Sequence, residues 1–462
     1  MTLGPAVDAL AQWLSGPDPA WWAVGAAIVA VWVLPVLAVV FPVAAIGQII
    51  ERKVAAAMQR RHGPNTVGID GIVRLVVRLG GFFLPRASQD RLVERICALP
   101  GLGLLKVLGL GQLAADGVKM IGKEDFIPAG TDGLIFRAAP YLALTGAFLP
   151  FAVIPFAQDL VALEVPVAAL YALAVSGVTV IALLMAGWGS GNKFSLLGGM
   201  RAVAQVISYE IPVGLAIAGV VLWCGTMDLH QIVAHQYNGE WYSFLGWNIV
   251  QSPFLFLLAC ILFFGGLAEC QRTPFDMAEA ESELVSGFNT EYSGLRWGMF
   301  AMAEYTEMIL VGCLVSTLFL GGYQSPIGEN WIITLAPWLQ TILHVGIFAA
   351  KFTAFVVLMV WIRWTLPRFR VDQVMRLCWL TLVPLCLVCL FGLALTMLLA
   401  NGTVTGAAFG RLPAMQHLAL GPVGYLLAWA IPVAVAVVLI VLARRKYGQM
   451  HPALRELTGG AS

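Results

Sequence analysis

The chain is poor in charge. Only 11% of its 462 residues are Asp, Glu, Lys or Arg, whereas 60% are hydrophobic. Because a soluble domain carries about a quarter charged residues, this composition excludes an ordinary soluble protein. The formal net charge of +1 gives no support to nucleic-acid binding.

Motifs for bound metals and nucleotides are also missing. The six histidines form no His-x-x-x-His pair or Cys/His cluster with metal-ligand spacing, so we predict no metal site. No glycine-rich phosphate loop follows a strand-like segment, which argues against a nucleotide site. Cys386 and Cys389 form a C-x-x-C inside an apolar run, where packing explains them better than redox work. The redox cofactors of any electron-transfer role must therefore lie in other chains.

Long apolar runs are what the chain has in abundance. Each is long enough to cross a bilayer as a helix. We predict an all-α membrane protein with about nine transmembrane helices and no soluble domain. The predicted spans are 21–50, 138–158, 166–187, 202–224, 251–268, 297–321, 334–361, 377–400 and 421–443.

The cations predict the orientation of these spans. If the N-terminus lies outside and the C-terminus inside, 25 of the 27 Lys and Arg residues fall in inside segments. Inside loops of membrane proteins carry such an excess of positive charge. The predicted inside segments are 51–137, 188–201, 269–296, 362–376 and 444–462.

The first inside loop, 51–137, is the largest polar segment. Its middle part, 72–110, alternates cations and apolar residues at near-helical spacing, which is typical of a helix lying on the membrane surface. A second short interfacial helix is expected over 112–126. We find no internal repeat, although many transporters have one.

Four charged residues fall within the predicted spans, where each costs about 2.5–3.5 kcal/mol unless it is paired, hydrated or neutralised. Glu210 should lie roughly 12 Å deep and Glu304 roughly 10 Å deep from the inside surface. These two acids could therefore face one hydrated cavity. Glu307 follows Glu304 on the same helical face, and Lys351 is the cation.

Two interpretations of these buried acids stay open. Pro212 should kink the helix that carries Glu210 and free a carbonyl near residue 208, and freed backbone is tolerated where it lines water or protein. Burial, and repulsion between neighbouring acids, would raise their affinity for protons, which suits groups that carry protons. Alternatively, they pair with Lys351 or Tyr209 and only hold helices together.

The loop at 269–296 is densely acidic. Pro274, Phe275 and Phe288 interrupt its acids, which suggests that the loop folds back into protein rather than lying in solvent. Its one cation before Arg296 is Arg272. Its carboxylates are Glu269, Asp276, Glu279, Glu281, Glu283 and Glu291.

Several sequence blocks now carry a resemblance to a known family. ERK at 51–53 is followed by GPN at 63–65, and LAADGVKMIGKEDFIP lies at 113–128. AGWGSGNKFSLLGGMRAVAQVISYEIP spans 186–212, and AECQRTPFDMAEAESELVSGFNTEYSG spans 268–294. MAEY at 302–305 and RWTLPRFRVDQVM at 363–375 follow in the same order. The chain resembles the quinone-chamber membrane subunit of respiratory complex I, which is the H subunit family of NADH:quinone oxidoreductase.

The resemblance implies a function for the whole chain. It would be the membrane subunit of a proton-pumping NADH:quinone oxidoreductase, forming the channel through which quinone enters and coupling quinone reduction to proton translocation. Quinone is then the substrate, and flavin and iron–sulfur clusters belong to partner subunits. The expected partners are antiporter-like and small membrane-arm subunits, the hydrophilic-arm subunits of the quinone site, and the lipid of a bacterial cell inner membrane. Alone, the chain should have no redox activity.

The resemblance also implies roles for particular residues. Proton relay and coupling are expected of Glu210, Asp276, Glu279, Glu281, Glu283 and Glu304, with Glu307, Lys351 and Glu291 as further relay candidates. The quinone channel is expected to use Glu51, Arg52, Lys53, Pro64, Asn65, Arg272, Phe275 and Phe288. Arg272 could hold one of the loop acids Asp276, Glu279, Glu281 and Glu283 ionised, or exchange partners as the loop moves. Arg363, Arg368 and Arg370 are interpreted as topology anchors and partner contacts.

The chain departs from the family pattern in places, and other functions compete. The segment 72–110 looks inserted, and the span 421–443 lengthens the C-terminus. The nearest alternative is the homologous membrane subunit of a membrane-bound hydrogenase or formate hydrogenlyase. Alternatives of other classes are a stand-alone secondary transporter and a purely structural anchor.

Overall fold

The structure is a computed structural model of the whole chain. It describes residues 2–3, 10–12, 21–35, 39–64, 110–237, 243–278, 281–327, 332 and 334–401. The predicted surface segment 72–110, except its last residue, and the predicted span 421–443 with the basic tail lie outside the described residues.

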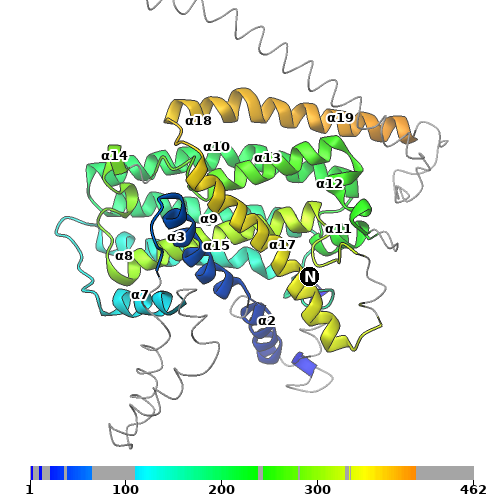
Figure 1. The fold of residues 1–462 in the computed structure, drawn as a ribbon, viewed down its shortest axis with the longest axis horizontal. Helices are drawn as coiled ribbons and strands as arrows, with labels where there is room; N and C mark the ends of the chain where they lie inside the picture. Colours follow the sequence, from blue (N-terminus) through cyan, green and yellow to red (C-terminus); the bar gives the residue numbers. More distant parts are fainter. Residues whose placement is uncertain are drawn as a thin grey trace, which may run out of the picture.

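The described residues are mainly helical (Figure 1). A two-residue antiparallel ladder joins β1 (Thr2–Leu3) to β2 (Leu163–Glu164). The long helices are α2 (Trp21–Pro35), α3 (Phe41–Met58), α7 (Leu110–Gly122), α8 (Gly133–Phe148), α9 (Ala168–Gly189), α10 (Lys193–Cys224), α13 (Pro253–Glu269), α15 (Gly294–Phe319), α17 (Pro337–Thr365) and α19 (Val383–Asn401). The short ones are η2 (Leu149–Val153), α11 (Leu229–His235), η3 (Ser243–Gly246), α12 (Asn248–Gln251), α14 (Glu281–Leu284), η4 (Gly287–Asn289), α18 (Val371–Leu377) and the π-helical turn η5 (Cys378–Leu382).

The helices agree with the predicted all-α membrane class. Within the described residues, six helical segments are long and apolar enough to cross a bilayer. Eight of the nine predicted spans overlap helices of the structure. The number of nine spans and the orientation of the bundle stay predictions. The six segments are Gly133–Val153, Ala168–Gly189, Lys193–Cys224, Gly294–Phe319, Pro337–Thr365 and Val371–Met397.

Two helices lie within the first predicted span, 21–50, and residues 36–38 between them lie outside the described residues. α2 covers Trp21–Pro35, and α3 begins at Phe41 with Pro42 in its first turn. Proline fits the first turn of a helix because the N–H it lacks has no partner there in any case. The predicted interfacial helix at 112–126 corresponds to α7, which packs against α3 and α15.

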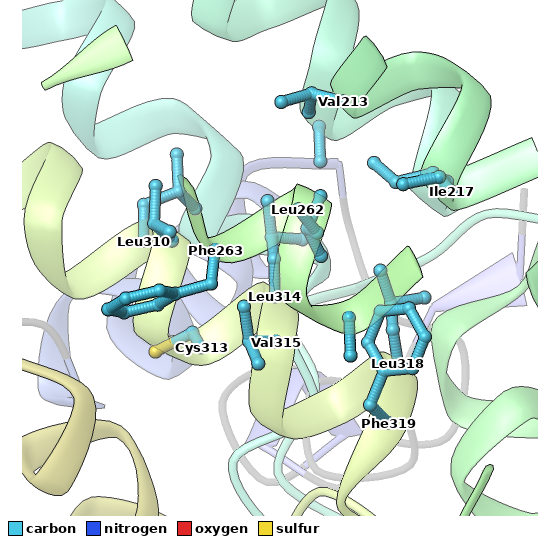
Figure 2. Packing of buried hydrophobic residues seen from close by; sticks show 14 of the residues in the cluster. Val213, Ile217, Leu262, Phe263, Leu310, Cys313, Leu314, Val315, Leu318 and Phe319 are labelled. Carbon is cyan, nitrogen blue, oxygen red and sulfur yellow. The ribbon is translucent and has the colours of Figure 1, made fainter. Parts of the chain in front are cut away.

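The core lies where α10, α13 and α15 pack together (Figure 2). Val213 and Ile217 of α10 meet Leu262 and Phe263 of α13 and the buried run of α15 that includes Leu310 and Leu314. α19 runs beside α10 and α13, and α17 crosses the bundle in contact with α15 and α3 (Figure 1). Cys386 and Cys389 are buried free thiols of this core, as the packing interpretation expects.

Local sequence sets the ends of α10. The side chain of Asn192 accepts a hydrogen bond from Phe194 N and caps the start of the helix, and Gly225 ends it at φ +72°. Small residues let a neighbour approach: a Cβ on Gly198 would lie 2.6 Å from the Cα of Gly287. The acidic loop is therefore pressed directly onto α10, which places it beside the buried acids.

Candidate functional site

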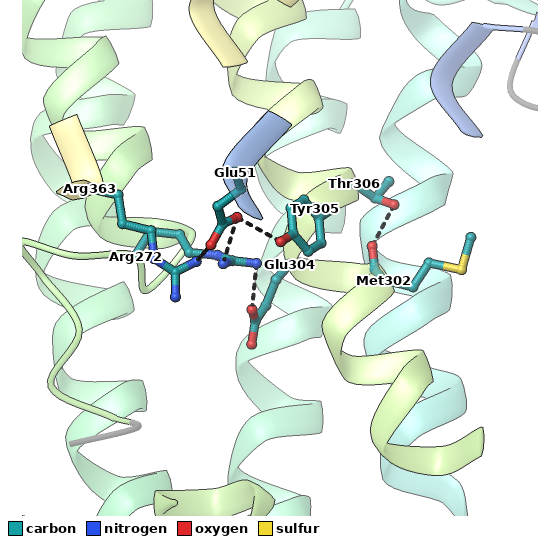
Figure 3. A network of polar contacts seen from close by, with 7 residues as sticks. All are labelled: Glu51, Arg272, Met302, Glu304, Tyr305, Thr306 and Arg363. Atoms are coloured by element: carbon teal, nitrogen blue, oxygen red, sulfur yellow. Dashed lines mark hydrogen bonds and ion pairs between the residues drawn. The ribbon is translucent and has the colours of Figure 1, made fainter. Parts of the chain in front are cut away.

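Five residues far apart in the sequence form a charged cluster (Figure 3). Arg272 Nη1 lies 3.5 Å from Glu51 Oε2, and its Nη2 lies 3.0 Å from Glu304 Oε2. Tyr305 donates its hydroxyl to Glu51 Oε2 at 2.6 Å, and Arg363 donates to Glu51 Oε1. The guanidinium of Arg272 also lies over the ring of Tyr305, 4.4 Å from its centroid.

Burial makes the pairing in this cluster necessary. The side chains of Glu51 and Arg272 are each 9% exposed. A buried ion is tolerated when a partner and hydrogen bonds replace its water, and removing one partner leaves a costly unpaired charge. The cluster joins α3, α15, α17 and the loop after α13, so its charges fix four segments relative to one another.

An apolar groove runs beside the charged cluster, between α3 and α17. Its volume is about 180 Å³. A Cβ on Gly47 would lie 3.7 Å from Val356 and 4.0 Å from the ring of Tyr305, so the absence of a side chain there keeps the groove open toward the cluster. The lining residues are Val43, Ile46, Gly47 and Ile50 of α3, and Thr353, Val356, Val357 and Val360 of α17.

A second buried site, the acidic cavity, brings three carboxylates together. Glu210 of α10, Glu269 of α13 and Glu307 of α15 line a cavity of about 30 Å³, with Gly177 and Thr179 of α9 on its wall. Within the described residues, none of these three acids makes an ion pair with a cation. The cavity has polar walls and is large enough for about one water molecule. Three carboxylates without a cation cannot all be ionised there at low cost.

The charged cluster and the acidic cavity are neighbours. Cys270 lines the cavity, and Arg272 of the cluster follows it two positions along the chain. On α15, Glu307 of the cavity is three residues from Glu304 of the cluster. Because Coulomb coupling is strong where water is sparse, a change in the partners of Arg272 would reach the cavity.

The prediction that Glu210 and Glu304 share one cavity is wrong. Glu304 pairs with Arg272 in the charged cluster, whereas Glu210 faces Glu307 and Glu269. Their similar depth held no information about direction around the helix axis. Arg272 forms ion pairs with Glu51 and Glu304, and its pairing with an acid of its own loop stays a prediction.

Lys351 does not pair with the buried acids. Its ammonium donates to the carbonyls of Leu320, Gly322 and Gln324 at 2.6–2.8 Å and lies 4.4 Å from the ring centroid of Trp247. With a rise of about 1.5 Å per residue, this places it roughly 24 Å from Glu304 along α15. Lys351 therefore caps the far end of α15. Tyr209, the other expected partner, donates to Val374 O instead.

The acidic loop is only partly described. Glu283 is exposed and accepts a hydrogen bond from Arg201 at 2.6 Å, and Glu291 accepts one from Asn192 at 2.7 Å. The hydrogen bond from Arg201, together with its charge, lowers the pKa of Glu283. Asp276 is half-buried. Glu279 and the side chain of Glu281 lie outside the described residues.

The other residues predicted for the quinone channel differ in burial: some are exposed and others lie in the core. Arg52 is exposed and pairs with Asp116 of α7 at 2.5 Å, and Lys53 and Pro64 are half-buried near the end of α3. Asn65 lies outside the described residues. The sequence predicts that Phe275 and Phe288 offer aromatic surface to the channel, but both are buried.

Packed rings explain the burial of these two phenylalanines. Phe275 contacts the rings of Tyr209 and Phe369, and Phe288 contacts that of Phe300. Both side chains are at most 2% exposed. They hold the acidic loop against the bundle and do not line an opening.

Sequence reasoning misses three members of the two sites. Arg363 is interpreted from sequence as a topology anchor, yet it pairs with buried Glu51. Tyr305 follows Glu304 directly, but nothing in its spacing indicates a bond to α3. Glu269 stands out in the sequence only as one acid of a loop, although its place at the end of a buried helix could have identified it. Among the described residues, no group of three or more His, Cys, Asp or Glu could hold a metal ion.

The fold and these sites define a class: a multi-helical membrane protein with a buried ion-pair cluster beside an unpaired acidic cavity. Comparison with known proteins gives the family. The profile of the NADH dehydrogenase family matches residues 31–82 and 100–394. The gap, 83–99, falls within the predicted insertion, and the match ends before the predicted span 421–443.

Two relatives are both named as the H subunit of NADH-quinone oxidoreductase. The one from Anaeromyxobacter dehalogenans (strain 2CP-C) is 39% identical over 344 residues, which cover 72% of this chain and 82% of the relative. The one from Bacillus thuringiensis (strain Al Hakam) is 41% identical over 349 residues, covering 76% and 88%. The chain belongs to the H subunit family of NADH-quinone oxidoreductase.

Proposed function

We propose that this chain is the membrane subunit of a proton-pumping NADH:quinone oxidoreductase, and that it admits quinone and couples quinone reduction to proton movement. Family membership supports a place in such an oxidoreductase complex. The observation that carries the finer proposal is the adjacency of an apolar groove, a paired charged cluster and an unpaired acidic cavity.

The groove between α3 and α17 suits the tail of a quinone. A quinone has an apolar tail and a head with two carbonyls, so its path needs an apolar wall that leads to a few polar groups. The groove is lined almost entirely by aliphatic side chains. Ile50 at its inner end is followed directly by Glu51 of the charged cluster. A tail in the groove would place polar groups of the head toward Tyr305 and the two arginines.

The charged cluster and the acidic cavity suit the coupling step. Quinone takes up two electrons, delivered by partner subunits, and two protons to become quinol. That change alters the charge near Arg272, whose guanidinium is shared between Glu51 and Glu304. A shift of Arg272 toward either acid changes the field at Glu307. Glu210, Glu269 and Glu307 then take up or release a proton toward the membrane arm.

The rest of the assembly completes this function. Flavin and iron–sulfur clusters belong to hydrophilic-arm subunits, and the antiporter-like and small membrane subunits continue the proton path. The location that we propose for the assembly is a bacterial cell inner membrane. Asp276, Glu279, Glu281, Glu283 and Glu291 stay candidates for sensing the charge of the quinone, and Arg52, Lys53, Pro64 and Asn65 for shaping the channel rim.

The variant Gly47→Leu tests the access route in the assembled enzyme. A leucine there fills the groove, so we expect kcat/KM for a long-tailed quinone to fall about tenfold. The matched control is Gly346→Leu on α17, where an added side chain meets open space. Assembly is checked by size-exclusion chromatography of the complex. Equal activity of the two variants would contradict access through this groove.

A further inference from the structure

The proline of α10 leaves one backbone carbonyl without its helical donor. Pro212 lies inside α10 and has no N–H, so Ser208 O cannot accept the usual hydrogen bond from four residues ahead. The sequence predicts this free carbonyl. In the structure Cys378 Sγ lies 3.0 Å from Ser208 O and donates to it. The Cys378 side chain is fully buried.

The same stretch of α10 is held by further contacts from the last described helices. Tyr209 donates its hydroxyl to Val374 O at 3.0 Å, one turn before Cys378. Cys386 Sγ lies 3.6 Å from the carbonyl oxygen of Pro212. Cys378 also begins the π-helical turn η5, and such turns are frequent at functional sites. The segment 374–386 therefore contacts α10 at Ser208 and Tyr209, just before the proline, and at Pro212 itself.

Glu210 lies between the contacted residues Tyr209 and Pro212. Its side chain lines the acidic cavity, on the side of α10 that meets α9 and α15. A helix interrupted by proline can swivel at the freed carbonyl, and a swivel would turn Glu210 relative to Glu269 and Glu307.

We propose that Cys378 is a positioning residue: its thiol replaces the backbone donor that Pro212 removes and so fixes the direction of Glu210 in the acidic cavity. This inference rests on the proposed function of that cavity. The thiol acts through one hydrogen bond and takes no part in redox chemistry.

The alternative is that Cys378 only fills space. Three variants of the assembled enzyme separate the two ideas: Cys378→Ala removes the donor, Cys378→Ser keeps one, and Cys389→Ala removes a buried core thiol from the same bundle side. Loss of one hydrogen bond should lower quinone reduction roughly three- to tenfold in Cys378→Ala and displace its pH profile. Cys378→Ser should restore the profile, and Cys389→Ala should leave it unchanged.

A double variant keeps the test decisive even if Cys378→Ala assembles poorly. Pro212→Ala restores a backbone N–H at residue 212, which can bond Ser208 O within the helix. In that background Cys378→Ala should have no further effect on assembly or pH profile. Such a result would be a measurable coupling between positions 212 and 378. Additive effects, or no rescue by serine, would overturn the inference.

Glu210→Gln, measured in parallel, separates this inference from the proposed function. If Glu210→Gln leaves quinone reduction and proton pumping intact, the proposed function of the cavity fails. If Glu210→Gln is impaired and Cys378→Ala keeps the wild-type rate and pH profile, only the role of Cys378 fails.

Discussion

The charged cluster and the acidic cavity are built from the same kinds of residue, but only one of them is compensated. In the cluster, Glu51 and Glu304 share the charges of Arg272 and Arg363. In the cavity, Glu210, Glu269 and Glu307 face one another with no cation paired to them among the described residues. Paired charges fix helices in place, whereas unpaired acids respond to protons. The contrast supports the proposal that the cavity handles protons, while the cluster holds the helices together and passes on the charge of Arg272.

Breaking the cluster should have the largest effect. Glu51→Gln leaves Arg272 and Arg363 without their shared counter-ion, which costs about 3–5 kcal/mol when a buried pair is broken. We expect thermal unfolding of the solubilised complex at a clearly lower temperature and loss of quinone reduction. The control is Asp116→Asn, which breaks the more exposed pair with Arg52. If both variants lose the same stability, the cluster is no anchor.

Filling the cavity should have an intermediate effect. A Cβ on Gly177 would lie 3.8 Å from Glu210 Oε1, so Gly177→Val occupies the space beside that carboxylate. The valine takes the space that a water molecule needs, and a lost hydrogen bond to a buried carboxylate costs about 1–3 kcal/mol, or at least about fivefold in proton transfer. Proton pumping per quinone reduced, measured in proteoliposomes, should fall while the complex stays assembled. Gly346→Val adds the same bulk in open space and serves as the control.

The smallest effect is expected at the surface, where Glu283 pairs with Arg201. Because its pKa is lowered in the folded protein, Glu283 stabilises the fold above its unfolded pKa, about 4.3, and this contribution is lost as pH falls through the folded pKa. Glu283→Gln should therefore cost less than about 1 kcal/mol at pH 7 and nothing in strong acid. Thermal unfolding at both pH values measures this. A large loss at pH 7 would place Glu283 in a buried network.

The sequence predicts the apolar helices well because apolar length decides membrane insertion: eight predicted spans overlap helices, and six of them overlap segments long and apolar enough to cross a bilayer. It predicts the carbonyl freed by Pro212 because that follows from covalent structure. The sequence does not predict toward which neighbouring helix a buried side chain points. Glu304 and Glu307 are three residues apart, yet they serve different sites, and Arg363 reaches a partner 312 positions away. Pairings over such separations depend on how helices pack, which spacing does not reveal.

Infrared difference spectroscopy of the assembled enzyme tests most directly whether the acids of the cavity exchange protons during quinone reduction. Reduction of quinone should change the carbonyl-stretch signal of protonated carboxyl groups, and Glu210→Gln or Glu307→Gln should remove that change while Asp116→Asn retains it. If the signal persists in both cavity variants, the acids of the cavity do not exchange protons with the reaction, and the account is contradicted.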